Sequence, residues 1–502
     1  MSLKKNILAN YISQIYVTII GIVMVPQFIH YMGAEAYGLV GFFSMLQAWF
    51  QLLDMGLTPT MSRETARFRG GAVDALSLRR LLRALEGIFV SVAILGAVTM
   101  VAGAGTIAGS WLKVQQLSFV EVQQAIMLMA LIIALRWVCG LYRGLVSGFE
   151  NLTWLGGFNI VVTTARFVLI IPFFIYLGTS PTVFFGYQLT IAVIETVVLV
   201  FQAYRLMPKN KMERSTPWKW EPIRGQLKFS LIIAFTSSTW VLVTQTDKLI
   251  LSKLLQLTDY AYFTISVLIA SGISIVSGPI SSALLPRLTK LHAENNEIGL
   301  ISLYRSATQL VAIIAIPATF VLAVFAEKVL WVWTGDAVIT MKAAPVLTLY
   351  ALGNGILAIG AFPYYLQFAK GDLNLHLIGS ALFVCFLLPF LFVATWKYGM
   401  IGPGYAWLGT HLVFFIFWLP IVHRHLSKGL HYKWLFLDLG PIFIISSLVI
   451  CAIRIWSVWP NQRFSVGVRI TEVSLMLLVV SAFGSSWIRE AIRVRWRARF
   501  AK

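Results

Sequence analysis

The stretch SSTWVLVTQTDKLILSKLL, residues 237–255, is apolar over most of its length but carries Asp247 and Lys248 side by side. An apolar run of about 20 residues is long enough to cross a hydrocarbon layer of about 30 Å as a helix. Similar runs recur along all 502 residues, of which 58% are hydrophobic and only 12% charged, with a mean hydropathy of +0.80. This composition excludes a soluble multidomain protein and indicates an all-α polytopic membrane protein.

The apolar runs predict fourteen transmembrane helices with short polar connections. Their approximate ranges are 8-30, 38-60, 84-109, 122-147, 156-178, 182-206, 228-252, 259-284, 303-325, 342-367, 374-396, 400-423, 436-457 and 466-488. Most of the 40 Lys and Arg residues fall at the termini or in the connections that follow even-numbered spans. Because short basic loops stay cytoplasmic, both termini are expected in the cytoplasm. The net charge of +20 is then mainly a topology signal and does not indicate nucleic acid as a partner.

A weak internal repeat predicts how the spans are grouped. Three pairs of stretches match, and the distance along the chain is nearly the same in each pair. The pairs are YMGAEAYGLVGF (31–42) with LLQLTDYAYFTI (254–265), LVSGFENLTWLGG (145–157) with LQFAKGDLNLHLIG (366–379), and YLGTSP (176–181) with KYGMIG (397–402). That separation equals six spans, and an even number keeps both copies in the same orientation.

We therefore expect two six-helix lobes related by a pseudo-two-fold axis along the membrane normal, with two further C-terminal helices. The predicted parts are an N-terminal lobe (1–206), a cytoplasmic linker (207–227), a C-terminal lobe (228–425), spans 13 and 14 (436–488) and a basic cytoplasmic tail (489–502). The tail sequence WIREAIRVRWRARFAK is suited either to contact with anionic lipid or to a topology signal alone.

Charged residues within the spans are the candidate functional residues. Each costs roughly 2.5–3.5 kcal/mol at the bilayer centre, so such side chains face the protein interior or one another. Helical spacing places Gln188 and Glu195 on one stripe, and Arg136 and Arg143 on one face. The predicted substrate-binding residues of the cavity are Arg136, Arg143, Arg166, Glu195 and Gln188.

Structural alternatives stay open for most of these positions. Arg136 or Arg166 is a candidate partner of Glu195 in a buried ion pair, and Lys248 is expected to extend toward the outer headgroups. The four-residue spacing of Gly140, Gly144 and Gly148 favours close helix packing over a binding site. His411, within a span, is expected to be a hydrogen-bonded structural residue.

Several enzyme classes lack support in the sequence. There is no Gly-Lys dipeptide and hence no Walker A loop, and no connection is long enough for a nucleotide-binding domain. No loop carries the paired carboxylates or metal-ligand cluster that a membrane transferase needs. We expect no catalytic residue, no metal and no cofactor apart from a coupling proton or Na⁺.

Several stretches resemble the Wzx-type O-antigen and polysaccharide flippases of the MOP (multidrug/oligosaccharidyl-lipid/polysaccharide) exporter superfamily. They are LANYISQIYVTIIGIVMVPQFIHYMGAEAYGLVGF (8–42), LLDMGLTPTMSRETAR (52–67), TQTDKLILSKLLQLTDYAYFTIS (244–266), LQFAKGDLNLHLIG (366–379) and YGMIGPGYAW (398–407). The resemblance covers nearly the whole chain in order, although each motif is degenerate and none is catalytic.

The resemblance implies a transporter and not an enzyme. Its cargo would be an undecaprenyl-pyrophosphate-linked glycan such as an O-antigen repeat of lipopolysaccharide. The protein would flip this glycan to the periplasmic leaflet of a bacterial inner membrane by alternating access, coupled to a proton or another ion as an antiporter. Partners would be membrane lipids, a polysaccharide polymerase and a chain-length regulator.

The resemblance implies that basic residues of the cavity contact the pyrophosphate. Asp54 and Asp247 match motif positions, and the resemblance implies a structural role for them rather than substrate binding. Asp247, beside Lys248, is also a candidate site for a coupling cation or proton. The alternatives are a lipid II flippase or multidrug exporter of the same superfamily, or a membrane polysaccharide polymerase.

Overall fold

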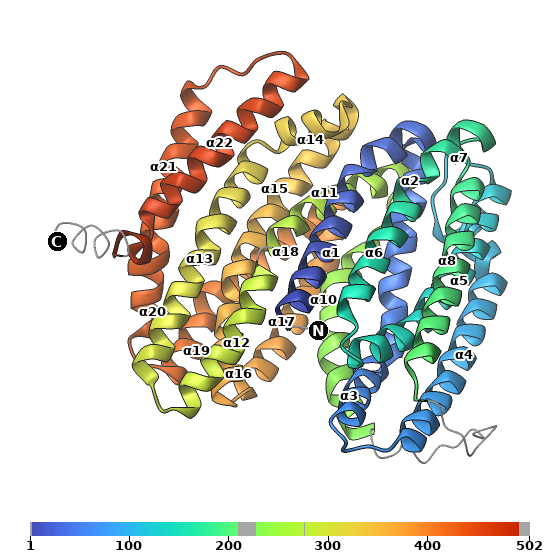
Figure 1. Ribbon diagram of the computed structural model, residues 1–502. Helices are drawn as coiled ribbons and strands as arrows, with labels where there is room; N and C mark the ends of the chain where they lie inside the picture. The colour runs from blue at the N-terminus through green and yellow to red at the C-terminus, as the bar shows by residue number, and fades with distance from the viewer. Residues whose placement is uncertain (1–2, 209–226, 276, 491–502) are drawn as a thin grey trace. The chain divides into compact units, whose positions relative to one another are not determined.

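The computed structural model describes residues 3–208, 227–275 and 277–490, and this part of the chain is built from helices (Figure 1). Most of the predicted linker, 207–227, and of the basic tail, 489–502, lies outside the described residues. The chain divides into two compact units, Met1–Ala261 and Tyr262–Lys502. The lobe boundaries inferred from the repeat stay a prediction.

The first unit contains a bundle in which α4, α5 and α8 stand side by side and α1 packs along α6 (Figure 1). Its helices are α1 (Leu3–Val23), α2 (Val25–Phe50), η1 (Gln51–Asp54), α3 (Leu57–Arg69), α4 (Ala75–Thr106), η2 (Ile107–Trp111), α5 (Phe119–Gly148), α6 (Leu152–Phe167), α7 (Ile170–Leu177), α8 (Pro181–Leu206) and α10 (Leu227–Leu254).

In the second unit, α13 packs against α15 and α22, and α21 packs along α22 (Figure 1). The α11 helix begins in the first unit and continues here. The helices are α11 (Leu257–Ile275), α12 (Ser277–Ala293), α13 (Glu297–Val324), α14 (Ala326–Thr334), α15 (Ala337–Gly360), α16 (Phe362–Lys370), α17 (Asn374–Tyr398), η3 (Gly399–Ile401), α18 (Gly402–Val413), η4 (Phe414–Trp418), α19 (Leu419–Leu426), α20 (Leu430–Tyr432), η5 (Lys433–Leu439), α21 (Gly440–Trp456) and α22 (Arg463–Gly484).

Among the described residues, ten helical runs are long and apolar enough to cross a membrane, which makes this a multi-pass membrane protein. One of these runs, Val25–Asp54, contains a break at Gly33, whose φ of +83° is not helical. That break falls between the first two predicted spans, 8–30 and 38–60. The total of fourteen spans and the symmetry of the lobes stay predictions.

Two pairs of repeat-matched positions share an unusual backbone conformation. Glu150 and its match Gly371 have φ values of +56° and +73°, and Gly178 and its match Gly399 have φ values of +100° and +57°. Positive φ is uncommon outside glycine, so each pair marks a matching chain reversal between helices. These turns support the repeat at the level of local structure.

Glycines allow α3 to lie directly on α5. A Cβ atom added at Gly148 would lie 2.5 Å from the Ser62 carbonyl oxygen, and one at Gly144 would lie 2.7 Å from the Thr58 carbonyl oxygen. No side chain fits at such distances, so these positions require glycine for the close approach of the two helices. The predicted packing role of the glycine spacing is confirmed.

Glu35, at the start of the α2 segment that follows Gly33, binds the connection between η2 and α5. Its carboxylate is only 5% exposed and accepts hydrogen bonds from the backbone N–H groups of Gln115, Gln116 and Leu117, at 2.5, 2.8 and 3.1 Å. Three charge-assisted bonds satisfy the buried carboxylate and fix this connection. Nearby, the Lys113 carbonyl oxygen accepts from the Leu257 N–H at 3.0 Å, and this bond joins the connection to the start of α11.

Polar groups at helix ends follow ordinary capping chemistry. Asp74 caps α4 by accepting from the Ser77 N–H, and the hydrogen bonds from Ser77 hold the pKa of Asp74 below its ordinary value. Ser118 and Glu121 form a reciprocal capping box at the start of α5. His411 in α18 is buried and bonds the Trp407 carbonyl oxygen through Nδ1, as expected for a structural histidine.

Candidate functional site: a cationic cluster in the first unit

Helices α5 and α8 bring four of the predicted site residues together. Arg136 Nη2 donates to Gln188 Oε1 at 3.0 Å, and Arg143 Nη2 donates to Glu195 Oε1 at 2.6 Å. Both contacts join residues 52 positions apart. The two arginines are seven residues apart on α5, and their partners are seven residues apart on α8. The two helices therefore run parallel and are joined by two matched polar contacts, which we call the ladder.

A break between α6 and α7 places Arg166 next to this ladder. Pro172 lacks the N–H that would bond the carbonyl of the fourth residue before it, so a continuous helix is disfavoured at this point. Two carbonyls just before the break receive side-chain donors from α8, because Tyr187 Oη donates to Ala165 O at 2.6 Å and Gln188 Nε2 donates to Arg166 O at 2.8 Å. Gln188 thus bridges Arg136 and the Arg166 backbone.

Aromatic rings and amides complete the surroundings of the arginines. The Arg136 guanidinium lies 5.4 Å from the centre of the Phe43 ring, and that of Arg166 lies 5.2 Å from the centre of Phe167. At such distances the ring faces attract the cations. Gln47 Oε1 accepts a long bond of 3.4 Å from Arg136, and Asn159 Oδ1 accepts from Arg143 Nη1.

The cluster has more positive than negative charge. Arg136, Arg143 and Arg166 face one carboxylate, Glu195, and each lies within a helical run that is long enough to span a membrane. Arg136 is 9% exposed and Glu195 is 3% exposed, whereas Arg143 keeps 30% of its side chain exposed, so solvent screens this surplus only in part. A site of this kind favours an anionic ligand with oxygen acceptors.

Three buried atoms in the same cluster lack a hydrogen-bond partner in the described part of the chain. They are the Nε atoms of Arg136 and Arg166 and Oε2 of Glu195. An unpaired buried donor or acceptor costs about 1–3 kcal/mol, so these atoms mark places where a ligand or water can bond. The two guanidinium nitrogens suit phosphate oxygens, and the carboxylate oxygen suits a proton or a sugar hydroxyl.

The predicted ion pair has a different cation from the one expected. The sequence suggested Arg136 or Arg166 as the partner of Glu195, but the structure places Arg143 there. Arg143 lies near the C-terminal end of α5, which ends at Gly148. Its side chain nevertheless points along α8 and is 30% exposed.

Asp247 and Lys248 lie on α10, apart from the cluster contacts. Asp247 is 5% exposed and accepts from the Lys248 backbone N–H at 2.7 Å. Lys248 does not extend toward the outer headgroups as expected, because its ammonium bonds the Thr244 carbonyl oxygen at 2.5 Å and Asp247 at 3.4 Å. The pair is therefore held along the helix.

Asp54 has a structural role at the start of α3. Its carboxylate accepts from the Thr58 hydroxyl at 2.6 Å and from the Thr58 backbone N–H at 3.2 Å. Met55 and Gly56 between them adopt left-handed conformations, with φ values of +45° and +73°. Asp54 thus closes a tight turn that begins α3 and positions Thr58 against the α5 glycines.

Sequence reasoning missed Gln47 and Tyr187 as members of the cluster. Neither carries a charge, and Tyr187 contributes only its hydroxyl to a carbonyl near the helix break. The equal seven-residue steps on α5 and α8 are compatible with two matched contacts, but they do not show which residues of the two helices lie at the same height.

These features define the class of protein: a multi-pass membrane protein whose helical bundle encloses a cationic polar cluster. The sequence model described as "Polysaccharide biosynthesis protein" matches residues 3–292. The chain therefore belongs to the polysaccharide biosynthesis protein family. A comparison with curated protein sequences found no match.

Solved transporter structures share the fold. The lipid II flippase MurJ, in an inward closed conformation, aligns with a TM-score of 0.70 and 11% identity over 98% of this chain and 100% of that chain. A multidrug resistance MATE family transporter of the MOP superfamily, in an inward-facing conformation, aligns with a TM-score of 0.65 and 15% identity over 86% of this chain and 96% of that chain. A MOP superfamily transporter from Pyrococcus furiosus, with a binding pocket described as reversed in polarity, aligns with a TM-score of 0.51 and 14% identity over 84% of this chain and 94% of that chain. The chain shares the fold of these transporters.

Proposed function

We propose that this protein flips a polyprenyl-diphosphate-linked oligosaccharide, such as an O-antigen repeat unit, from the cytoplasmic to the periplasmic leaflet of a bacterial inner membrane. Membership of the polysaccharide biosynthesis family and the MOP transporter fold support this proposal. The observation that carries it furthest is the cationic cluster around Arg136 and Arg166.

The charge of the cluster suits a diphosphate diester. Three guanidinium groups against the Glu195 carboxylate leave a surplus of two positive charges. A diphosphate diester carries one negative charge on each phosphoryl group, so its binding would neutralise the buried site. Planar guanidinium groups also match phosphate oxygens in a forked geometry. An organic cation, the cargo of many drug exporters, would meet repulsion here.

The proposed direction and energy source of transport rest on the family resemblance and on the distribution of basic residues. The distribution of Lys and Arg supports cytoplasmic termini. Transport would proceed by alternating access, as an antiport driven by a proton or Na⁺ gradient, with Asp247 as the candidate coupling carboxylate. The product would then be available to a polysaccharide polymerase and chain-length regulator.

A lipid II flippase is the second candidate, because the fold aligns over nearly the full length of the lipid II flippase MurJ. Lipid II also carries a diphosphate, so the cluster fits both cargoes. The two candidates differ in the glycan and are separated by offering each one to the same protein.

The test is transbilayer movement of fluorescent polyprenyl-diphosphate oligosaccharide and of fluorescent lipid II in proteoliposomes. Arg166→Ala is compared with wild type, with Arg469→Ala on exposed α22 as a matched control. We expect oligosaccharide movement by wild type and the control, and at least tenfold slower movement by Arg166→Ala at equal folded protein. Movement of lipid II alone would favour the second candidate, and movement of neither would refute both.

A further inference from the structure

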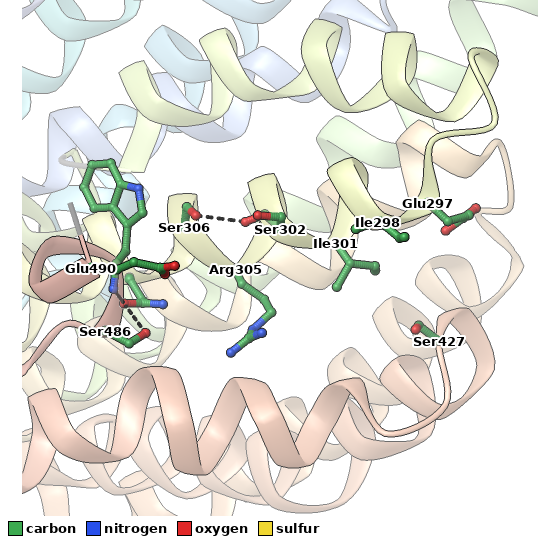
Figure 2. A pocket seen from close by; sticks show the side chains of 11 residues that line it. Glu297, Ile298, Ile301, Ser302, Arg305, Ser306, Ser427, Ser486 and Glu490 are labelled. Atoms are coloured by element: carbon green, nitrogen blue, oxygen red, sulfur yellow. Dashed lines mark hydrogen bonds between the residues drawn. The ribbon is translucent and has the colours of Figure 1, made fainter. Parts of the chain in front are cut away.

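A polar cavity of about 510 Å³ lies in the second unit and shares no lining residue with the cationic cluster (Figure 2). Its walls come from the first turns of α13, from Ser427 just after α19, and from the helical residues 486–490 that follow α22. Three membrane-spanning runs begin or end at these same places, namely Glu297–Val324, Asn374–Leu426 and Arg463–Gly484. The cavity therefore lies at the depth where spans meet the headgroup layer.

Arg305 is the cationic group in this cavity (Figure 2). Its Nε and Nη2 donate to the Asp438 carboxylate at 2.6 and 2.8 Å, and Asp438 is completely buried. This pair is fixed by Gln309, whose Nε2 also donates to Asp438 at 2.8 Å. Arg305 keeps 28% of its side chain exposed, so Nη1 stays available to a ligand in the cavity.

The rim of the cavity carries carboxylates and hydroxyls. Glu297 and Glu490 are exposed lining residues, and Ser302 and Ser427 also line the cavity (Figure 2). Glu297 binds Lys370 at 2.9 Å, which leaves Glu490 as the carboxylate without an ion pair among the described residues. Because Asp438 neutralises Arg305, a purely anionic ligand would meet net repulsion from this rim.

Apolar side chains at the mouth indicate a ligand from the membrane. Ile298 is 88% exposed and Trp487 is 42% exposed, and both line the cavity. Tryptophan is enriched where hydrocarbon meets headgroups, and an exposed isoleucine beside a polar cavity is suited to acyl chains or a glycerol backbone. A soluble metabolite would gain nothing from these groups.

We propose that this cavity binds the headgroup of a phospholipid that carries both a phosphate and a primary ammonium. The phosphate accepts from Arg305 Nη1 and the serine hydroxyls, and the ammonium donates to Glu490 at the rim. The cavity volume falls within the range of about 300–1,000 Å³ that is usual for ligand sites. A bound lipid would tie residues 486–490 to α13.

The test is native mass spectrometry of the delipidated full-length protein with phosphatidylethanolamine, phosphatidylcholine and phosphatidylglycerol of matched acyl chains. Free phosphoethanolamine serves as the soluble probe. We expect retention of phosphatidylethanolamine above the other two lipids and above the free headgroup. Glu490→Gln should weaken it by about fivefold, as expected for one partly exposed charge-assisted bond. Phosphatidylcholine, which cannot donate from its methylated nitrogen, should be insensitive to this substitution.

Glu294→Gln is the matched control, because Glu294 is an exposed glutamate near the same helix ends but outside the cavity lining. Ser427→Ala provides a second variant that removes one hydroxyl from the rim. Equal retention of the three lipids, or no effect of Glu490→Gln and Ser427→Ala in folded protein, would overturn the proposal. Equally strong binding of free phosphoethanolamine would overturn the assignment to a lipid. These outcomes are independent of the flippase assay.

Discussion

The ion pair between Arg143 and Glu195 is the most constrained contact of the cationic cluster, and its energy can be measured. The two groups are 2.6 Å apart, and the Glu195 side chain is only 4% exposed. Removing one partner of a fully buried pair costs about 3–5 kcal/mol, because the other charge is left unpaired. Arg143 is 30% exposed and keeps Asn159 as an acceptor, so Glu195→Gln should cost less, about 2 kcal/mol of unfolding free energy.

A double-mutant cycle separates the pair from the other contacts of each residue. Glu195→Gln, Arg143→Met and the double variant are unfolded reversibly by SDS in mixed micelles, with helicity followed by circular dichroism. Polar contacts between membrane helices usually contribute about 0.6 and at most about 1.7 kcal/mol. Because this pair is charged and short, we expect a coupling energy near the upper value, about 1.5 kcal/mol.

The exposed pair Arg469–Glu472 on α22 serves as the control cycle, since its side chains are 44% and 56% exposed. An ion pair at i, i+3 on one helix contributes about 0.2–0.5 kcal/mol. A coupling energy for Arg143 and Glu195 no larger than that of the control would show that their ion pair does not stabilise the folded protein as expected. The carboxylate would then not be engaged by Arg143 in the folded protein.

Three other perturbations test separate parts of the structure. Gly148→Ala should destabilise the protein by about 1–3 kcal/mol through overpacking of α3 on α5, whereas Gly157→Ala, with open space around it, should not; thermal unfolding of both variants measures the difference. Glu35→Gln should cost about 1–3 kcal/mol and speed hydrogen exchange at the Gln116 amide, and unchanged exchange would contradict the role given to Glu35. Asp247→Asn should abolish the dependence of transport on a proton or Na⁺ gradient, and an intact dependence in proteoliposomes would leave Asp247 with a structural role only.

The sequence was sufficient to predict the helical class and the charged members of the cluster. Charges within apolar runs are so costly that Arg136, Arg166 and Glu195 had to face the interior, and seven-residue steps placed their neighbours on the same faces. The partner of Glu195 was not predicted, because pairing depends on which helices lie together and on their relative height. Those depend on packing, such as the fit of α3 on the α5 glycines, which a single sequence does not display.

Side-chain direction was equally hard to predict at the edges of the spans. Lys248 was expected to extend toward the headgroups, but its ammonium finds the Thr244 carbonyl and Asp247 within reach on its own helix. A long flexible side chain can reach several hydrogen-bond acceptors of similar binding energy, and the local geometry determines which of them it bonds. The cavity around Arg305 was not predicted, because its lining comes from three distant parts of the chain.

We propose that the cluster of Arg136, Arg143, Arg166 and Glu195 binds a diphosphate. The most direct test of this proposal is equilibrium binding of polyprenyl diphosphate and polyprenyl monophosphate esters to the purified protein, wild type and Arg136→Gln. We expect wild type to prefer the diphosphate by about tenfold or more, as one additional charge-assisted contact implies, and Arg136→Gln to lose most of this preference. Equal affinity for the two lipids in wild type, or a preference that Arg136→Gln leaves unchanged, would contradict the proposal.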